Sequence, residues 1–178
     1  MRDDSIPEAR PALAAALVMA LAACTSIAAP VGQRPPQPYP GGPFPGGQSG
    51  APHFVRWPPS ECVPFARQVS GINLRGNANT WWAQAEGRYP RSRRPTPGSV
   101  IVFETAGLGH VGVVTRVVSD RLILIDHANW HGRGEVAVQV PVRDTSADNS
   151  WSEVKVWWLD TNQWGAKSYR IEGFIEPR

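Results

Sequence analysis

Two apolar runs flank a short polar turn in the middle of the chain, in the sequence GHVGVVTRVVSDRLILIDHANW at residues 109–130. Their length and their content of valine and isoleucine are typical of β-strands. A tight turn at Ser119 and Asp120 would join them as an antiparallel hairpin. Polar side chains stand at both open ends of this hairpin, so its folding should bring them together.

The register that follows from this turn places three polar side chains on one face of the hairpin. His110 lies opposite Asn129, while His127 lies opposite Gly112 and is a diagonal neighbour of His110. Directly opposed residues have Cβ atoms ~5 Å apart, and diagonal neighbours are ~7–8 Å apart. Because side chains alternate between the two faces of a strand, Asp126 should point to the opposite face.

A second pattern predicts a helix that begins near Cys62, in the sequence PPSECVPFARQVSG. Ser60 is a suitable N-cap, apolar residues follow at helical spacing, and Gly71 is a suitable end. Pro64 falls in the first turn, where its missing N–H costs little. At a helix N-terminus the dipole and the free N–H groups should lower the pKa of Cys62 and can hold an oxyanion. The alternative role for such a cysteine is that of a small buried hydrophobic residue.

A third predicted segment precedes the hairpin, in the sequence TPGSVIVFETAGLG. A turn at Pro97 and Gly98 should lead into a strand from Ser99 to Phe103. A glycine-rich loop then connects this strand to the one that carries His110.

The composition suits one compact domain and a tail. The chain has 178 residues, of which 42% are hydrophobic, and it contains 8 tryptophans. The net charge of +3 suits an anionic surface or polymer, although an ordinary solvated surface explains it equally well.

Residues 1–24 are predicted to be an export signal. The run PALAAALVMALAAC at residues 11–24 is shorter than the ~20 residues that cross a bilayer, and it has the length of the apolar part of a secretory signal. Its end, LAAC, resembles the bacterial lipobox, in which the cysteine, here Cys24, becomes the lipidated first residue. Cleavage near Ala28 and Ala29 is the alternative.

Residues 25–52 are dominated by proline and glycine and show no apolar periodicity. Such a segment cannot offset its ordering entropy by burial, so we expect a disordered linker. Residues 53–178 should then form the domain.

The chain contains 2 cysteines, and because Cys24 belongs to the predicted signal, Cys62 is left as a free thiol. Catalysis by a thiol needs an imidazole that takes and returns the proton, and a third group that orients the imidazole. His110 is the candidate base, and His127 or Asn129 is the candidate orienting group. A purely structural histidine is the alternative.

The motifs ECVPFAR, TPGSVIVF, GHVGVVTRV and IDHANW, in this order, resemble a CHAP domain, a cysteine- and histidine-dependent amidohydrolase/peptidase. The resemblance covers about residues 57–158. It implies a papain-like α+β fold, in which an N-terminal nucleophile helix packs on a small, barrel-like antiparallel sheet. Members of this family mostly cleave amide bonds in bacterial peptidoglycan, as N-acetylmuramoyl-L-alanine amidases or as peptide endopeptidases.

Carried over by position, Cys62 matches the nucleophile of the family and His110 matches the general base. Asn129 matches the asparagine of the NW motif. His127 stands where many members have a glutamate, so it can orient His110 by a hydrogen bond but cannot stabilise an imidazolium as a carboxylate does. We predict that His127 is the principal orienting residue and that Asn129 supports the site.

The resemblance implies acyl transfer through a Cys62 thioester, with backbone N–H groups holding the oxyanion. No cofactor or metal is expected, and His53 and His131 do not complete a recognisable ligand spacing. The expected partners are peptidoglycan and, through Cys24, a membrane, with no nucleic-acid partner. We expect a monomer in the periplasm or cell envelope.

Two tryptophans near the motifs are candidates for substrate contact. Trp130 and Trp81 would line a glycan or peptide groove, although at least one of Trp81 and Trp82 should pack in the core. The basic loop RYPRSRR at residues 88–94 is expected to be solvated. Two other functions remain open: a cysteine amidohydrolase with a non-wall substrate, and a tethered wall-binding module without activity.

Overall fold

The computed structural model describes residues 50–58 and 60–178. The predicted export signal, with its lipidation site Cys24, lies outside the described residues, as does the predicted linker up to residue 49. Within the described part of the chain, no helix is both long and apolar enough to cross a membrane.

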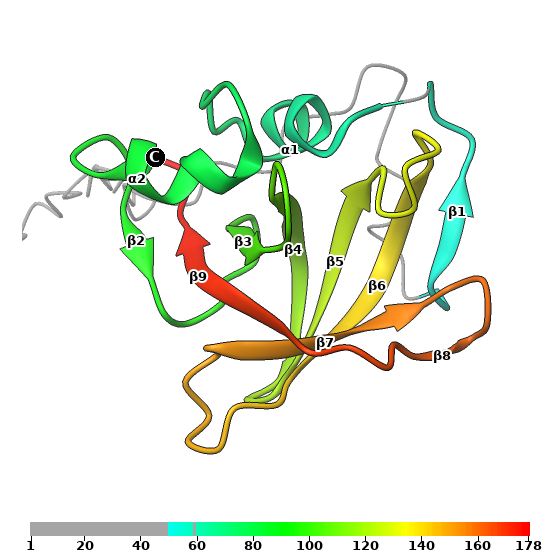
Figure 1. Ribbon diagram of the computed structural model, residues 1–178. Helices are drawn as coiled ribbons and strands as arrows, with labels where there is room; N and C mark the ends of the chain where they lie inside the picture. The colour runs from blue at the N-terminus through cyan, green and yellow to red at the C-terminus, as the bar shows by residue number, and fades with distance from the viewer. Residues whose placement is uncertain (1–49, 59) are drawn as a thin grey trace, which may run out of the picture. The chain divides into compact units, whose positions relative to one another are not determined.

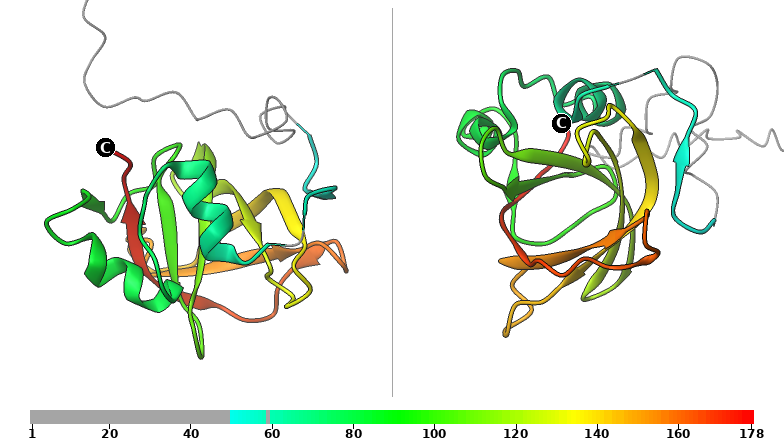
Figure 2. Two further views of the ribbon diagram at one scale, coloured as in Figure 1. Left: turned by 90° about the horizontal axis from the view of Figure 1, so that it is seen from above. Right: turned by 45° about the vertical axis from the view of Figure 1, so that its right-hand side comes forward.

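Six antiparallel strands form a closed barrel (Figure 2, right). They follow the order β6–β5–β4–β3–β9–β7, and a pairing between β6 and β7 closes the ring. The structure thus confirms a barrel-like antiparallel sheet with few helices. The strands of the barrel are β3 (Val100–Glu104), β4 (His110–Ser119), β5 (Leu122–Ala128), β6 (Val136–Asp144), β7 (Glu153–Trp158) and β9 (Tyr169–Ile175).

Short elements surround the barrel (Figure 1). Three short strands extend the sheet: β1 (His53–Val55) pairs with β6, β2 (Arg91–Ser92) pairs with β9, and β8 (Gln163–Trp164) pairs with β7. The helical elements precede β3 in the sequence, and they are α1 (Cys62–Ser70), the 3-10 turn η2 (Ala78–Thr80) and α2 (Trp81–Ala85). In Figure 1, α1 and α2 lie near the end of the barrel at which β4 begins.

Alternate residues of β3 face two different core clusters. Ile101 and Phe103 belong to a cluster to which all the barrel strands contribute, so this cluster fills the barrel interior. Val100 and Val102 belong to a second cluster, which includes Phe65 and other buried residues of α1 and α2. Because successive side chains of a strand point to opposite faces, the helices cover the outer surface of the barrel.

The hairpin formed by β4 and β5 follows the predicted register only at its open end. The predicted turn at Ser119 and Asp120 is wrong by one residue, because Ser119 pairs with Leu122. Two register shifts follow along β4, and Val113 then pairs with Asp126, which is the predicted alignment. Bulges of this kind increase local twist, which a closed barrel requires.

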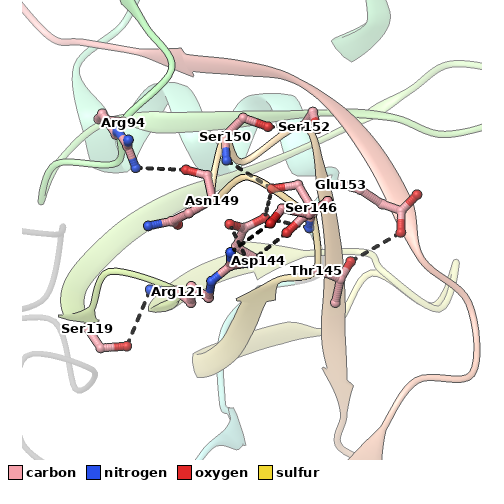
Figure 3. A network of polar contacts seen from close by, with 11 residues as sticks. Arg94, Ser119, Arg121, Asp144, Thr145, Ser146, Asn149, Ser150, Ser152 and Glu153 are labelled. Atoms are coloured by element: carbon pink, nitrogen blue, oxygen red, sulfur yellow. Dashed lines mark hydrogen bonds and ion pairs between the residues drawn. The ribbon is translucent and has the colours of Figure 1, made fainter.

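A polar network holds the opposite end of the barrel, where β4 ends (Figure 3). The buried carboxylate of Asp144 accepts hydrogen bonds from the backbone N–H of Ser146 at 2.9 Å and from its hydroxyl at 2.6 Å. The Arg121 guanidinium pairs with the same carboxylate at 3.3 Å and donates to the Ser146 carbonyl oxygen at 2.7 Å. This network ties the chain that leaves β6 to the turn between β4 and β5.

Candidate functional site

Helix α1 begins at Cys62, as predicted, and ends before Gly71, whose φ of 74° lies in the left-handed region. The N-cap is Glu61 rather than the predicted Ser60. Glu61 has an extended backbone conformation, and the Ser60 hydroxyl donates to the carbonyl oxygen of Glu61 instead of capping the helix. Cys62 is therefore a free, partly buried thiol at the first helical position.

The Cys62 thiol lies against the start of β4. Burial raises the pKa of this thiol above its usual value, and the Glu61 carboxylate adds to the increase. Hydrogen bonds to the sulfur from the backbone N–H groups of Val111, Val63 and Cys62 itself favour the thiolate, but they offset only part of this increase. The predicted lowering of the Cys62 pKa is therefore wrong, because the N–H groups act on a sulfur that is largely removed from water.

His110 opens β4, directly before Val111, whose N–H faces the Cys62 sulfur. The side chain of His110 is buried, and its Nε2 lies 3.0 Å from Nδ1 of His127. The structure thus brings the two predicted histidines together. When Nε2 of His110 donates in this contact, Nδ1 of His110 is free to accept a proton.

Both histidines of the pair are neutral at neutral pH. Burial, and then the neighbouring His127, lower the pKa of His110 well below its usual range. Burial, and then the nearby His131, lower the pKa of His127 to about 3. The two rings therefore share one N–H in their hydrogen bond. A neutral His110 is in the protonation state that a general base needs.

Trp130 packs against both histidines. The centroid of its ring lies 4.7 Å from that of His110 and 5.3 Å from that of His127. Phe103 and Tyr169 pack on the indole at centroid distances of 5.5 Å and 5.2 Å. Trp130 is therefore a wall of the site, and only the part of the indole that remains exposed can contact a substrate.

Trp81 does not contribute to this wall. Its side chain is fully buried in the cluster between the helices and the barrel, which rules out the predicted contact with a substrate. This burial agrees with the expectation that at least one of Trp81 and Trp82 packs in the core. Trp82 is partly buried, and the guanidinium groups of Arg91 and Arg93 lie 4.9 Å and 5.4 Å from its ring centroid.

The hydrogen bonds of the Asn129 side chain go to Glu61 and Gly134 and not to His110. β5 ends at Ala128, and Asn129 takes a left-handed backbone conformation with a φ of 59°, which an asparagine tolerates. Its Nδ2 donates to Oε2 of Glu61 at 2.6 Å, and its Oδ1 accepts from the backbone N–H of Gly134 at 2.7 Å. The predicted cluster of three polar groups is therefore a pair of histidines, with Asn129 bound to the start of α1.

The carboxylate of Asp126 makes no hydrogen bond to either histidine in the described structure. Its buried carboxylate accepts a hydrogen bond from the N–H of Gln139 at 2.7 Å through Oδ1, while Oδ2 has no partner among the described residues. Burial raises the pKa of Asp126 to about 7. This placement agrees with the expectation that Asp126 points away from His110.

Two glutamates that the sequence reasoning did not identify contact the same region. Glu61 binds Asn129, and the Glu135 carboxylate accepts from the N–H of His131 at 2.7 Å. Their positions in the sequence could have identified them, because Glu61 directly precedes Cys62 and Glu135 closely follows the NW motif.

The two histidines outside the pair do not form a metal site. Across residues 50–58 and 60–178, no three His, Cys, Asp or Glu side chains are arranged to hold a metal ion. His131 instead faces Asp160 at 3.4 Å, and His53 contacts the carbonyl oxygen of Ala51 at 2.8 Å. Cys62 and His110 are of the two residue types, thiol and imidazole, that attack on an acyl group uses.

Comparisons with known proteins point to one family. A model of the CHAP domain matches residues 53–129, a segment that contains Cys62 and both paired histidines. Proteins named N-acetylmuramoyl-L-alanine amidase sle1, from two strains of Staphylococcus epidermidis, are 44% identical to this chain over 55 residues. The alignment covers 30% of this chain and 17% of each relative, so it spans a small part of their length. Residues 53–129 of this chain belong to the CHAP domain family, as the four sequence motifs predicted.

Proposed function

We propose that the domain hydrolyses amide bonds of bacterial peptidoglycan by cysteine-dependent acyl transfer. The observation that carries the proposal is the 3.0 Å contact of His110 with His127, directly beside the N–H that faces the Cys62 sulfur. The CHAP match and the amidase relatives support peptidoglycan as the substrate. In this proposal the fold is papain-like, with α1 as the nucleophile helix on the outer surface of the barrel.

The first half of the reaction forms a thioester. His110 takes the proton of Cys62 at Nδ1 while the sulfur attacks the amide carbon. His127 holds the imidazole through Nε2 and fixes the tautomer in which Nδ1 is free. Backbone N–H groups at the start of α1, including that of Cys62, stabilise the oxyanion. The C–N bond then breaks, and the amine leaves with the proton that His110 returns.

The second half of the reaction releases the acid. Water attacks the thioester carbon while His110 accepts a proton from the water, and that proton reaches the sulfur as the C–S bond breaks. Because the thiol and the imidazole are both neutral at rest, proton transfer accompanies the attack rather than preceding it. His127 carries no negative charge, so the transient imidazolium is stabilised mainly by the charge that develops on the substrate.

We further propose that the protein works in the cell envelope. An export signal at residues 1–24 would deliver the chain, and lipidation of Cys24 would hold it on a membrane. The linker at residues 25–52 would then give the domain the reach to contact the wall. The apolar run that ends in LAAC and the similarity to wall amidases support this arrangement.

Digestion of purified peptidoglycan by the full-length chain tests the function and identifies the bond. Mass spectrometry should detect soluble fragments with the wild-type chain and none with a matched Cys62→Ala variant. Stem peptides released whole from the glycan indicate an amidase, whereas fragments cut within the peptide indicate an endopeptidase. An absence of fragments with the wild-type chain would contradict the proposal and favour a non-wall substrate or a binding module.

A further inference from the structure

We propose that the loop of residues 129–135, which connects β5 to β6, is a clamp that positions the nucleophile helix through Glu61. Here Glu61 and Asn129 are positioning residues, since both act through Cys62, and Glu135 holds the loop in shape. The inference rests on the proposed role of Cys62 as the nucleophile. It assigns Asn129 to the cysteine side of the site, whereas the sequence placed it beside the histidine.

The loop has one well-defined shape because Glu135 binds it from within. The Glu135 carboxylate accepts hydrogen bonds from the N–H of His131 at 2.7 Å and from the N–H of Arg133 at 3.2 Å. The backbone carbonyl oxygen of Glu135 accepts a third hydrogen bond, from the N–H of Asn129 at 2.7 Å. These three bonds hold the first residue of the loop in the left-handed conformation that turns the Asn129 side chain towards α1.

Two hydrogen bonds join this loop to the residues directly before Cys62. The N–H of Ser60 donates to the carbonyl oxygen of Gly134 at 3.0 Å. The Nδ2 of Asn129 donates to the Glu61 carboxylate at 2.6 Å, while its Oδ1 accepts from the N–H of Gly134 at 2.7 Å. Asn129 therefore lies in the middle of the clamp and uses both ends of its amide.

The start of α1 depends on this clamp for its position. Its N-cap, Glu61, makes no side-chain capping bond to the helix, so its carboxylate is available to the loop. Cys62 is the next residue, and its sulfur must meet the imidazole of His110 on β4. β5 carries His127 and leads directly into the loop, so one segment of chain orients the base and also places the nucleophile.

A carboxylate beside a nucleophilic sulfur has an electrostatic cost. The negative charge of Glu61 disfavours the Cys62 thiolate and so opposes the chemistry. A positioning role explains why such a group can nonetheless serve the reaction, because misplacement of a catalytic group by 1 Å can cost on the order of 100-fold in rate. The charge effect and the positioning effect have opposite signs, so substitutions can separate them.

The test uses Glu61→Gln and Glu61→Ala in the full-length chain with Cys24→Ser, which leaves Cys62 as the single thiol. Glutamine keeps an acceptor oxygen for Asn129 and removes the charge, whereas alanine removes both. Loss of the charge should speed alkylation of Cys62 by iodoacetamide in both variants. Turnover of peptidoglycan should fall by about 10- to 100-fold in Glu61→Ala with little change in KM, and clearly less in Glu61→Gln.

Two further variants sharpen this test. Asn129→Ala should lower kcat as Glu61→Ala does, and the double variant should be no worse than either single one, because both remove the same bond. Glu86→Gln is the matched control, since Glu86 is an exposed glutamate at the end of α2 whose carboxylate pairs with Arg91, and it should leave turnover unchanged. Equal turnover in Glu61→Gln and Glu61→Ala, or additive losses in the double variant, would overturn the clamp.

Amide hydrogen exchange provides a readout that does not depend on the substrate. The Ser60 N–H should exchange several-fold faster in Glu61→Ala than in the wild-type chain, and Glu61→Gln should restore most of its protection. Unchanged exchange at Ser60 in Glu61→Ala would overturn the clamp even if the protein cleaves peptidoglycan. A wild-type chain that cleaves no peptidoglycan but shows the predicted exchange would instead overturn the proposed function alone.

Discussion

The Nε2 atom of His110 lies 3.0 Å from the Nδ1 atom of His127, and both imidazoles are buried. Two neutral rings in this geometry can share a single N–H, so the tautomer of one ring determines that of the other. In the proposed mechanism, His127 therefore orients the base without carrying charge. The site differs in this respect from one with a carboxylate as the third group, which would also stabilise the imidazolium.

Substitution of His127 should reduce turnover by removing this control of the tautomer. We expect His127→Ala to lower kcat by about 10²- to 10⁴-fold, the range seen when a general base loses its orienting partner. Asn129→Ala should cause a smaller loss, because Asn129 contacts Glu61 rather than His110. Steady-state kinetics on soluble peptidoglycan fragments will decide the order, and a larger loss for Asn129→Ala would reverse the assignment.

Substitution of Cys62 by alanine should abolish hydrolysis and leave the fold intact. The side chain is only partly buried, so its truncation removes the nucleophile without opening a large cavity in the core. Circular dichroism and thermal unfolding should match the wild-type chain, while fragment release from peptidoglycan should be undetectable. Retained hydrolysis by a folded Cys62→Ala variant would eliminate the cysteine mechanism.

The reactivity of Cys62 should rise steeply towards alkaline pH. Burial raises the pKa of this thiol, and burial keeps His110 unprotonated, so the resting site holds a thiol and not a thiolate. Alkylation by iodoacetamide should therefore be slower at neutral pH than that of a small-molecule thiol, and it should still increase above about pH 9. A rate plateau that begins below neutral pH would show a thiolate–imidazolium pair instead.

Asp126 should make the folded state less stable as the pH rises. Its pKa increases from 3.8 to about 7 on burial, so the folded state binds this proton more tightly than the unfolded state does. Below the unfolded pKa, ionisation of Asp126 does not change the free energy of unfolding. As the pH rises towards 7 it lowers this free energy increasingly, and above that pH the loss levels off at about 4 kcal/mol. Asp126→Asn should therefore gain stability relative to the wild-type chain between about pH 4 and about pH 8.

Urea unfolding of both chains across this pH range will measure the difference. The comparison with the wild-type chain is necessary because the lowered pKa values of His110 and His127 favour the folded state at higher pH and act in the opposite direction. Asp120→Asn, at an exposed turn, is a suitable control. Turnover should change little in Asp126→Asn, and a collapse of activity in the folded variant would make Asp126 the true third residue of the site.

Lipidation of Cys24 should determine where the protein is found. The wild-type chain is expected in the membrane fraction of cells, and Cys24→Ala is expected in the soluble envelope fraction. Cys62→Ala should partition like the wild-type chain, since the domain itself contains no membrane-spanning helix among its described residues. Continued membrane association of Cys24→Ala would argue against the anchor.

The sequence was sufficient to predict the features that depend on local pattern. Strand alternation placed His110 near His127 and turned Asp126 to the other face, because these relationships depend only on pairing near the open end of the hairpin. The extent of α1, from Cys62 to the residue before Gly71, followed from helical spacing and the terminal glycine, although the N-cap is Glu61 rather than Ser60. The four motifs identified the family.

Features that depend on tertiary structure were not predicted. The turn at Ser119 was misplaced because the bulges in β4 arise from the curvature of the closed barrel. The position of Asn129 depends on a single residue in the left-handed region, after which the chain turns away from the sheet. The raised pKa of Cys62 reflects the partial burial of its thiol by the surrounding fold, which the capping pattern cannot reveal.

The pairing of β6 with β7 has a consequence for behaviour at high concentration. Each of the six barrel strands has a hydrogen-bonded neighbour on both sides, so the barrel presents no long open edge to another chain. The outermost strands in the described part of the sheet are very short, with 3 residues in β1 and 2 in each of β2 and β8. Long exposed edges are the usual templates for intermolecular β-pairing. Molecules of this protein crowded together on a surface should therefore resist aggregation through their sheets.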